Sequence, residues 1–292
     1  MKKIYKTILI LVSLIILLIL YLINSEYIIK SFLEYSKLFY TKLFPVSLIF
    51  FIFSTLLIEY KILDIIPINI NSIYIYLLSL ISGFPSGSKY IRELLDNNYI
   101  SHEEASSLIL FSHFPNPLFI LGSINLIINN KTICFKILLS IILSNFIILL
   151  FTKKYKKKHH NTLYPNNFSK ILKKSIYTSI KTILLIYGTS IFFYLISSII
   201  TKYISFNPYL YILISGIFDL TKGVFSTSII NNTIIKSLFI LIFISFGSIS
   251  IHIQVKSILE DTLLYKSFIK GRIIGTILTI IIFLLLISPI RC

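Results

Sequence analysis

The sequence predicts an all-α polytopic membrane protein with two inverted repeats, each holding a re-entrant helical hairpin and a broken transmembrane helix. Three observations predict this fold class. The 292 residues are 56% hydrophobic and 13% charged, with a mean hydropathy of +0.89, which would leave a soluble domain with large exposed apolar patches. Apolar stretches long enough to span a bilayer recur along the chain. Two further apolar regions are interrupted by proline and glycine in the same order.

The net charge and the cysteines exclude several classes of function. The charge of +17 comes from basic residues beside apolar spans, so membrane topology explains it and no nucleic-acid partner is expected. Cys134 and Cys292 do not form a disulfide framework, and no Cys/His spacing resembles a metal site, so neither a metal nor a cofactor is expected. An enzyme is not expected, because no nucleophile and base pair or phosphate loop is found.

Full spans are predicted at 7–23, 43–58, 133–151, 182–200 and 272–288. The first is expected to be a retained helix, because no small-residue cleavage site follows it before Glu26. After it, apolar side chains such as Tyr35 and Phe39 alternate helically with charged ones, which predicts a short amphipathic helix on the membrane surface. Residues 1–42 therefore form an amino-terminal unit of one span and one interfacial helix.

A basic loop at 152–174 divides the rest of the chain into a first repeat at 43–151 and a second repeat at 175–292. A loop this basic is typical of the cytoplasmic side. The lysines at the amino terminus and the basic residues before the last span are expected on the same side, which places the carboxyl terminus outside. The residues that carry this orientation are Lys153, Lys154, Lys156, Lys157, Lys158, Lys170, Lys173 and Lys174 in the loop, and Lys256, Lys266, Lys270 and Arg272 before the last span.

The first interrupted region covers 70–129. Its apolar run ends at Gly83, Pro85 and Gly87, a density of proline and glycine that cannot lie inside a continuous helix, so a hairpin is predicted over 70–95. A second helix is predicted from Ser101, where Ser101 and Glu104 form a capping box, to His113. Pro115 and Pro117 then break this crossing, which resumes over 118–128.

The second interrupted region, 208–260, repeats this order. A break is predicted from Gly216 to Gly223 and another at Gly247 and Ser248. The registers agree, because the Ile-Ser-Gly run ending at Gly83 recurs 133 residues later at Gly216. If the basic loop is cytoplasmic, each half needs an odd number of crossings, so each hairpin re-enters and each broken helix crosses once. The halves are then inverted, as in secondary transporters.

Broken helices at membrane depth predict a site. Non-helical backbone survives there only where protein or a water-filled cavity satisfies it, and the amino ends of half-helices attract anionic groups. The expected partners are therefore a small anionic solute and the lipid bilayer. The candidate substrate-binding residues are Ser86, Gly87, Ser88, Lys89, Asn116, Asp219, Thr221, Ser248, Ser250 and Gln254. The residues expected to break the helices are Gly83, Pro85, Pro115, Pro117, Gly216 and Gly247.

Other roles stay open for several of these side chains. Asn116, Ser248 and Gln254 are equally suited to satisfying broken backbone as to contacting a ligand. Asp219 is suited to substrate or ion handling, or to a position at the external interface. Lys89 is the basic side chain that we retain as a partner for an anion.

Several of these motifs resemble a known family, the YlbJ-type sporulation integral membrane proteins. The resemblance covers about residues 43–290 and rests on the stretches 81–90, 103–105, 114–120, 219–223 and 246–250, together with Gln254. It implies a gate-domain fold related to concentrative nucleoside transporters. It also implies a role in endospore formation, with movement of dipicolinic acid across the outer forespore membrane. The chain departs from the family in its shorter length and in Asp219, where a glutamate is expected.

Two alternatives to this activity remain. One is ion-coupled transport of a nucleoside or another metabolite. Few intramembrane carboxylates are available for such coupling, which ranks this alternative lower. The other is a sporulation scaffold or sensor in the membrane that does not transport. A homo-oligomer is compatible with every alternative, because relatives of the fold often assemble.

Overall fold

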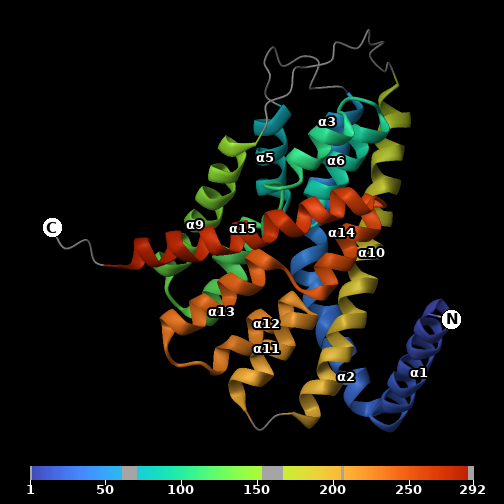
Figure 1. Cartoon of the computed structure of the whole chain (residues 1–292), viewed down its shortest axis with the longest axis vertical. Helices are drawn as coiled ribbons and strands as arrows, with labels where there is room; N and C mark the ends of the chain where they lie inside the picture. The colour runs from blue at the N-terminus through green and yellow to red at the C-terminus, as the bar shows by residue number, and fades with distance from the viewer. Residues whose placement is uncertain (1, 61–70, 153–166, 205–206, 289–292) are drawn as a thin grey trace.

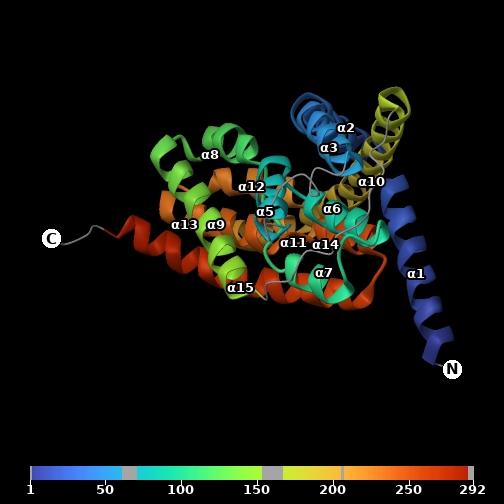
Figure 2. The same ribbon diagram turned by 90° about the horizontal axis from the view of Figure 1, so that it is seen from above.

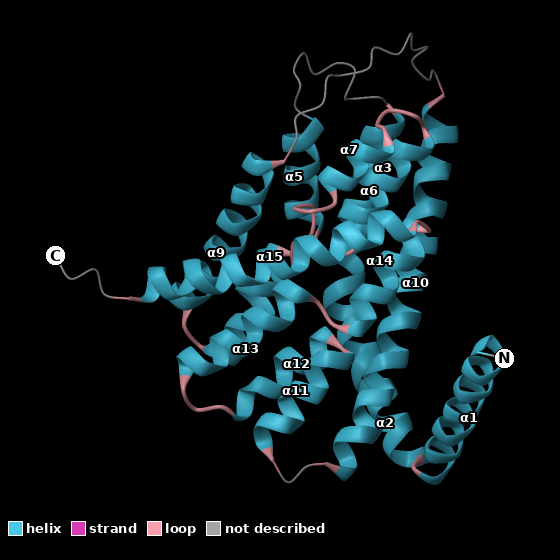
Figure 3. Ribbon diagram, in the orientation of Figure 1, coloured by secondary structure: helices cyan, strands magenta, loops and turns pink. Residues whose placement is uncertain are grey.

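A computed structural model describes residues 2–60, 71–152, 167–204 and 207–288. Every regular element in these ranges is helical, and Figure 3 draws helices joined by loops. The all-α prediction is therefore confirmed for the described residues. The five lysines at 153–158 that carry the predicted orientation lie outside these ranges, as does residue 70, where the first hairpin was predicted to begin.

The two halves present their helices in matching order (Figure 1). Counted from Phe44–Glu59 in the first half and from Phe168–Tyr203 in the second, a helix is followed by a helical hairpin, an interrupted helix and a final long helix. The first half contains α1 (Lys2–Ile23), α2 (Ser25–Leu38), the π-helical turn η1 (Phe39–Leu43), α3 (Phe44–Glu59), α5 (Asn71–Ser82), α6 (Ser86–Asp96), α7 (His102–Leu108), the π-helical η2 (Phe119–Ile124), α8 (Asn125–Ile128) and α9 (Lys131–Phe151). The second contains α10 (Phe168–Tyr203), α11 (Pro208–Phe218), α12 (Leu220–Ser226), the 3₁₀ turn η3 (Thr227–Ile229), α13 (Thr233–Phe246), α14 (Ile249–Leu259) and α15 (Thr262–Ile287).

Polar caps fix where many of these helices begin. Asn207, Asn232 and Asp261 precede α11, α13 and α15, and each side chain accepts hydrogen bonds from the first backbone N–H groups of its helix. Such caps satisfy donors that have no partner within the helix. Ser101 caps α7 by accepting from the Glu104 backbone N–H at 3.2 Å, as the capping-box motif predicted.

Among the described residues, five helices are long and apolar enough to cross a membrane, which confirms a multi-pass arrangement by length and composition. These spans are Ile4–Ile23, Lys131–Phe151, Phe168–Tyr203, Thr233–Leu259 and Thr262–Ile287. A sixth results if α2, η1 and α3 count as one span that bends by 48°. The first span contributes no buried side chains, so its apolar surface is available to lipid.

Three predicted segments are corrected. The amphipathic helix predicted on the membrane surface within residues 1–42 continues through η1 into α3. Its side chains Tyr35 and Phe39 are buried against α10. The last span, predicted from 272, begins ten residues earlier at Thr262, because Asp261 caps the helix there and its first turns pack into the protein through Leu264 and Phe268. The helix predicted to reach His113 ends at Leu108, since the chain leaves helical geometry before Pro115.

Two helix pairs organise the molecule. The antiparallel helices α3 and α10 lie side by side, and Lys174 pairs with Glu59 at 2.7 Å at one end of the molecule. Helix α15 extends across the molecule in Figures 1 and 2 and packs against α9 and α13. Ser144 and Thr279 share a hydrogen bond of 2.7 Å at the α9–α15 interface.

Candidate functional site

A cavity of about 570 Å³ lies where the interruptions meet, within the usual range for small-molecule sites. Its wall takes residues from both hairpin turns, from both interrupted helices and from α2, η1, α3 and α10. The wall residues from the turns and interruptions include Ser82, Phe84, Pro115, Asn116, Asp219, Leu220, Thr221, Ser250, Ile251 and Gln254. Lys42 and Asp219 are the charged residues among the described residues of the wall.

Half of the candidate substrate-binding residues reach this cavity. Those on its wall are Asn116, Asp219, Thr221, Ser250 and Gln254. Those that are not on its wall are Ser86, Gly87, Ser88, Lys89 and Ser248. The division follows the helices, because the beginning of α6 is covered by protein whereas the α11–α12 turn faces the open space.

Close backbone contact explains why the beginning of α6 is covered. A Cβ atom on Gly87 would lie 1.9 Å from the Ser112 carbonyl oxygen, so only glycine fits. Ser88 hydrogen-bonds to His113 Nε2 at 2.8 Å, and Ser86 to Ser82 Oγ at 2.6 Å. The expectation that these residues form an open anion-binding helix end is therefore wrong: the non-helical stretch after α7 occupies that position.

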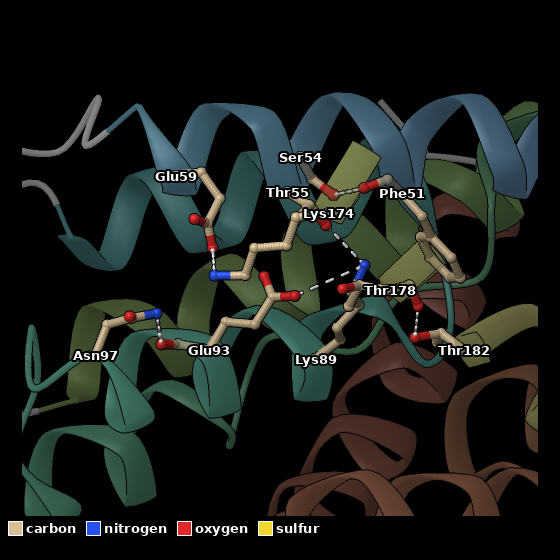
Figure 4. A network of polar contacts seen from close by, with 10 residues as sticks. All are labelled: Phe51, Ser54, Thr55, Glu59, Lys89, Glu93, Asn97, Lys174, Thr178 and Thr182. Carbon is tan, nitrogen blue, oxygen red and sulfur yellow. Dashed lines mark hydrogen bonds and ion pairs between the residues drawn. The ribbon is translucent and has the colours of Figure 1, made fainter. Parts of the chain in front are cut away.

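Lys89 is buried by its own set of partners (Figure 4). Its ammonium group donates to Thr55 Oγ1 on α3 at 2.8 Å, lies 3.8 Å from Glu93 Oε1 and sits over the Phe51 ring at 5.1 Å. Glu93 and Thr55 compensate the charge, so Lys89 connects α6 to α3 and does not offer a free cation to an anion.

The first interruption is shaped by Gly83 and Asn116. Gly83 has a φ of +77°, and a Cβ atom there would lie 2.8 Å from the Asn116 backbone nitrogen. Pro85 immediately precedes α6. Asn116 Oδ1 accepts a hydrogen bond from Leu118 N at 2.8 Å, which leaves the amide nitrogen free to donate to a solute. Pro115 lies in the non-helical stretch, whereas Pro117 begins the next helical segment, where proline is well tolerated.

Asp219 forms the turn of the second hairpin. It caps α12 by accepting from the Lys222 backbone N–H at 3.0 Å, and its other oxygen accepts from the Ser250 hydroxyl at 3.3 Å. Ser250 also shares a hydrogen bond of 2.7 Å with Ser248, which precedes α14. The hairpin turn and the second interruption are thus joined by a short chain of hydroxyls, and Thr221 faces the cavity beside it.

Gly216 is not a helix break, contrary to the prediction. It lies inside α11, where an added Cβ would meet the Phe243 ring at 2.2 Å, and a Cβ added to Gly223 of α12 would lie 2.2 Å from the Gly216 Cα. These glycines let the hairpin arms pack closely. The actual turn is at Asp219. The other break, Gly247, has a φ of +90° and separates α13 from α14.

Gln254 contributes a polar group that has no partner among the described residues. Its amide nitrogen donates to Ser190 Oγ on α10 at 2.8 Å, whereas Oε1 is buried without a hydrogen bond. A buried acceptor without a partner is costly, so an unmatched oxygen on a cavity wall is suited to a donor on a bound molecule. Ser190, which the sequence did not single out, also lies on this wall.

Arg272 lies in the protein interior, contrary to the prediction. The sequence placed it with flanking basic residues, yet it is 2% exposed inside α15. Its Nη1 donates to the carbonyls of His113 at 2.9 Å and Ser245 at 3.2 Å, and its Nη2 to Asn145 Oδ1 at 3.2 Å. One guanidinium therefore satisfies backbone at both interrupted helices.

Lys222 was also missed, although the repeat register points to it. It lies 133 residues after Lys89, the offset that relates Gly83 to Gly216. Its ammonium group is buried and donates to Ser198 Oγ at 2.9 Å and Thr201 Oγ1 at 3.0 Å, both on α10. The Tyr194 ring lies 5.4 Å away. Lys222 therefore connects the second hairpin to α10 as Lys89 connects the first to α3.

Comparison with known proteins adds a relative. No family model and no solved structure matches the chain. The chain is similar to the sporulation integral membrane protein YlbJ of Bacillus subtilis strain 168, at 23% identity over 303 aligned residues, which cover 84% of this chain and 74% of the relative. The relationship to gate-domain proteins and nucleoside transporters stays a prediction. The chain is thus a multi-pass integral membrane protein and a homologue of this sporulation protein, as its sequence motifs predicted.

Proposed function

We propose that the chain is a sporulation-associated transporter that moves a small solute by alternating access. The observation that carries the proposal is the shared cavity, to which both hairpin turns and both interrupted helices contribute. Interrupted helices at membrane depth are tolerated where they line a cavity, and transporters place their substrate sites there. In this proposal the hairpins at α5–α6 and α11–α12 re-enter from opposite sides, and the two halves are inverted repeats.

The matched lysines support the repeat. Lys89 and Lys222 occupy equivalent positions in their hairpins. Lys89 donates to one hydroxyl on α3 and Lys222 to two hydroxyls on α10, and both helices precede the hairpin in the chain. Each also lies over an aromatic ring, Phe51 or Tyr194. Equivalent anchors on both hairpins fit a mechanism in which one hairpin moves while the other stays closed.

The proposed substrate is a small anionic metabolite, with dipicolinic acid the favoured molecule. A cavity of about 570 Å³ accommodates a single aromatic ring with two carboxylates. The Asn116 amide nitrogen, the Ser190 hydroxyl and the Lys42 ammonium group supply donors on the wall. The relative is a sporulation integral membrane protein, which supports a role in sporulation, and the membrane that we propose for the chain is the outer forespore membrane.

The test is uptake of labelled dipicolinic acid into proteoliposomes that contain the purified chain. We expect uptake above that of empty vesicles, and a fall of about tenfold or more in Asn116→Ala, which loses a cavity donor. Asn97→Ala is the matched control, because Asn97 is exposed and bonds only to the Glu93 carbonyl. Folded protein that takes up no more than empty vesicles would contradict the proposed substrate, and equal uptake by both variants would contradict the site.

A further inference from the structure

We infer that Asp219 binds a proton that crosses the membrane together with the solute. The inference rests on the proposed transport function and extends it, because it assigns a coupling ion and the residue that carries it. The structural basis is a buried carboxylate on the wall of the cavity whose charge has no counter-ion in contact.

Asp219 is buried and borders the cavity. The residue is 1% exposed, yet it lies on the wall of the cavity that a solute must occupy. Among the described residues, no Lys, Arg or His nitrogen forms an ion pair with its carboxylate. Ionisable residues inside a membrane are costly, and those that persist are typically functional.

The titratable groups around Asp219 have other partners. The titratable groups that interact with it electrostatically are Lys222 on α12, Tyr194 on α10 and Tyr35 on α2. The Lys222 ammonium group, however, is bound to the hydroxyls of Ser198 and Thr201. The titratable groups of α13 and α14 have partners elsewhere: Lys236 donates to the Ile127 carbonyl, His252 bonds with Tyr265 and the Phe246 carbonyl, and Lys256 lies over the Tyr265 ring.

The Asp219 carboxylate would repel an anionic solute. An anionic solute that enters this cavity meets the carboxylate of Asp219 in a medium of low dielectric constant, where like charges repel strongly. A proton from the aqueous phase removes that repulsion by converting the carboxylate to an acid. When the solute leaves on the opposite side, the acid releases the proton there, so each cycle carries one proton and one solute in the same direction.

The neighbouring groups argue against a metal cation as the coupling ion. Both carboxylate oxygens already accept hydrogen bonds, from the Lys222 backbone N–H and from the Ser250 hydroxyl. Metal cations require several oxygen ligands that direct lone pairs to one point. Asp219 instead meets donors, and the Ser250–Ser248 hydroxyl pair extends from it toward the beginning of α14.

The experiment compares two modes of dipicolinate movement in proteoliposomes, with the membrane potential clamped at zero and at pH values that keep the solute ionised. Counterflow exchange without a gradient tests transport itself. Accumulation driven by an inward proton gradient tests coupling, and a gradient of one pH unit should support accumulation of up to about tenfold. The readout is the ratio of uptake with and without the gradient, so each variant is its own reference.

We expect the gradient to stimulate uptake by the unmodified chain and by Asp219→Glu, but not by Asp219→Asn, which keeps an acceptor for the Lys222 N–H without a titratable group. Asp261→Asn is the matched control, because Asp261 also caps a helix, α15, but lies outside the cavity. It should respond like the unmodified chain.

Three outcomes would overturn the inference. Undiminished stimulation in Asp219→Asn would exclude Asp219 as the proton carrier. If the unmodified chain exchanges dipicolinate but its accumulation does not respond to the proton gradient, or responds to a sodium gradient, proton coupling is rejected and the transport function stands. Absence of exchange in folded, unmodified protein would instead refute transport, and the inference with it.

Discussion

At the scale of single residues, one buried guanidinium satisfies the backbone of both interrupted helices. Arg272 donates to the carbonyl of His113, in the non-helical stretch after α7, and to the carbonyl of Ser245, in the last turn of α13. Unpaired carbonyls are costly in an apolar interior, and the planar guanidinium supplies several donors in fixed directions. Arg272 therefore stabilises the geometry on which the cavity depends.

Replacing Arg272 with methionine should lower the free energy of unfolding by about 3 kcal/mol or more, because the change leaves several buried acceptors unpaired. Thermal unfolding of the purified protein in detergent measures the effect. Lys270→Met is the control, since Lys270 is exposed two residues earlier on the same helix. Indistinguishable midpoints for the two variants would contradict the role of Arg272.

The sequence could not place Arg272 in the interior. A charged residue at the edge of an apolar run is typical of the membrane interface, and hydropathy does not distinguish that position from a buried one. Lys222 differs, because its offset of 133 residues from Lys89 was present in the sequence. The repeat register therefore contained a signal for Lys222 that the pattern of helix breaks did not supply.

At the scale of elements, the second hairpin depends on close approach of its arms. A Cβ atom on Gly223 of α12 would lie 2.2 Å from the Gly216 Cα on α11, a backbone atom that cannot move aside cheaply. The sequence predicted Gly216 as a helix break, whereas it lies inside α11 at the contact with α12. Glycine permits both a helix break and a close helix contact, and the local sequence does not distinguish them.

Replacing Gly223 with alanine should destabilise the protein by about 1–3 kcal/mol through overpacking between the hairpin arms. Gly188→Ala is the matched comparison, because Gly188 lies within α10 with no other atom within 4 Å of an added Cβ. That change should stabilise α10 by about 0.5–1 kcal/mol. Chemical or thermal unfolding should move the two variants in opposite directions, and shifts in the same direction would refute this account of the hairpin.

At the scale of the whole molecule, the order of helices followed from the sequence more closely than the contacts between them. Apolar length predicted four of the five candidate spans, whereas α3, predicted as a span by itself, is long enough only together with α2 and η1. Proline and glycine predicted the interruptions at Gly83–Pro85, Pro115 and Gly247. The covering of Ser86, Gly87 and Ser88 by residues 112–113 depends on tertiary packing, which the local pattern does not contain. The contribution of Tyr35 and Ser190 to the cavity depends on packing of α2 and α10 for the same reason.

In the proposed mechanism, the cavity that both halves line opens to each side of the membrane in turn. Ser190→Cys tests it, because Ser190 lies on the cavity wall and is 6% exposed. The substitution is made with Cys134 and Cys292 replaced by serine. Lys270→Cys in the same background is a control that should react from one side only, because Lys270 is exposed outside the cavity.

The decisive measurement is labelling of the Ser190→Cys variant by a membrane-impermeant thiol reagent, in vesicles of each orientation, with and without dipicolinic acid. Alternating access predicts labelling from both sides and protection from both sides by the solute. Labelling from one side only under every condition, unaffected by the solute, would contradict alternating access to a shared cavity.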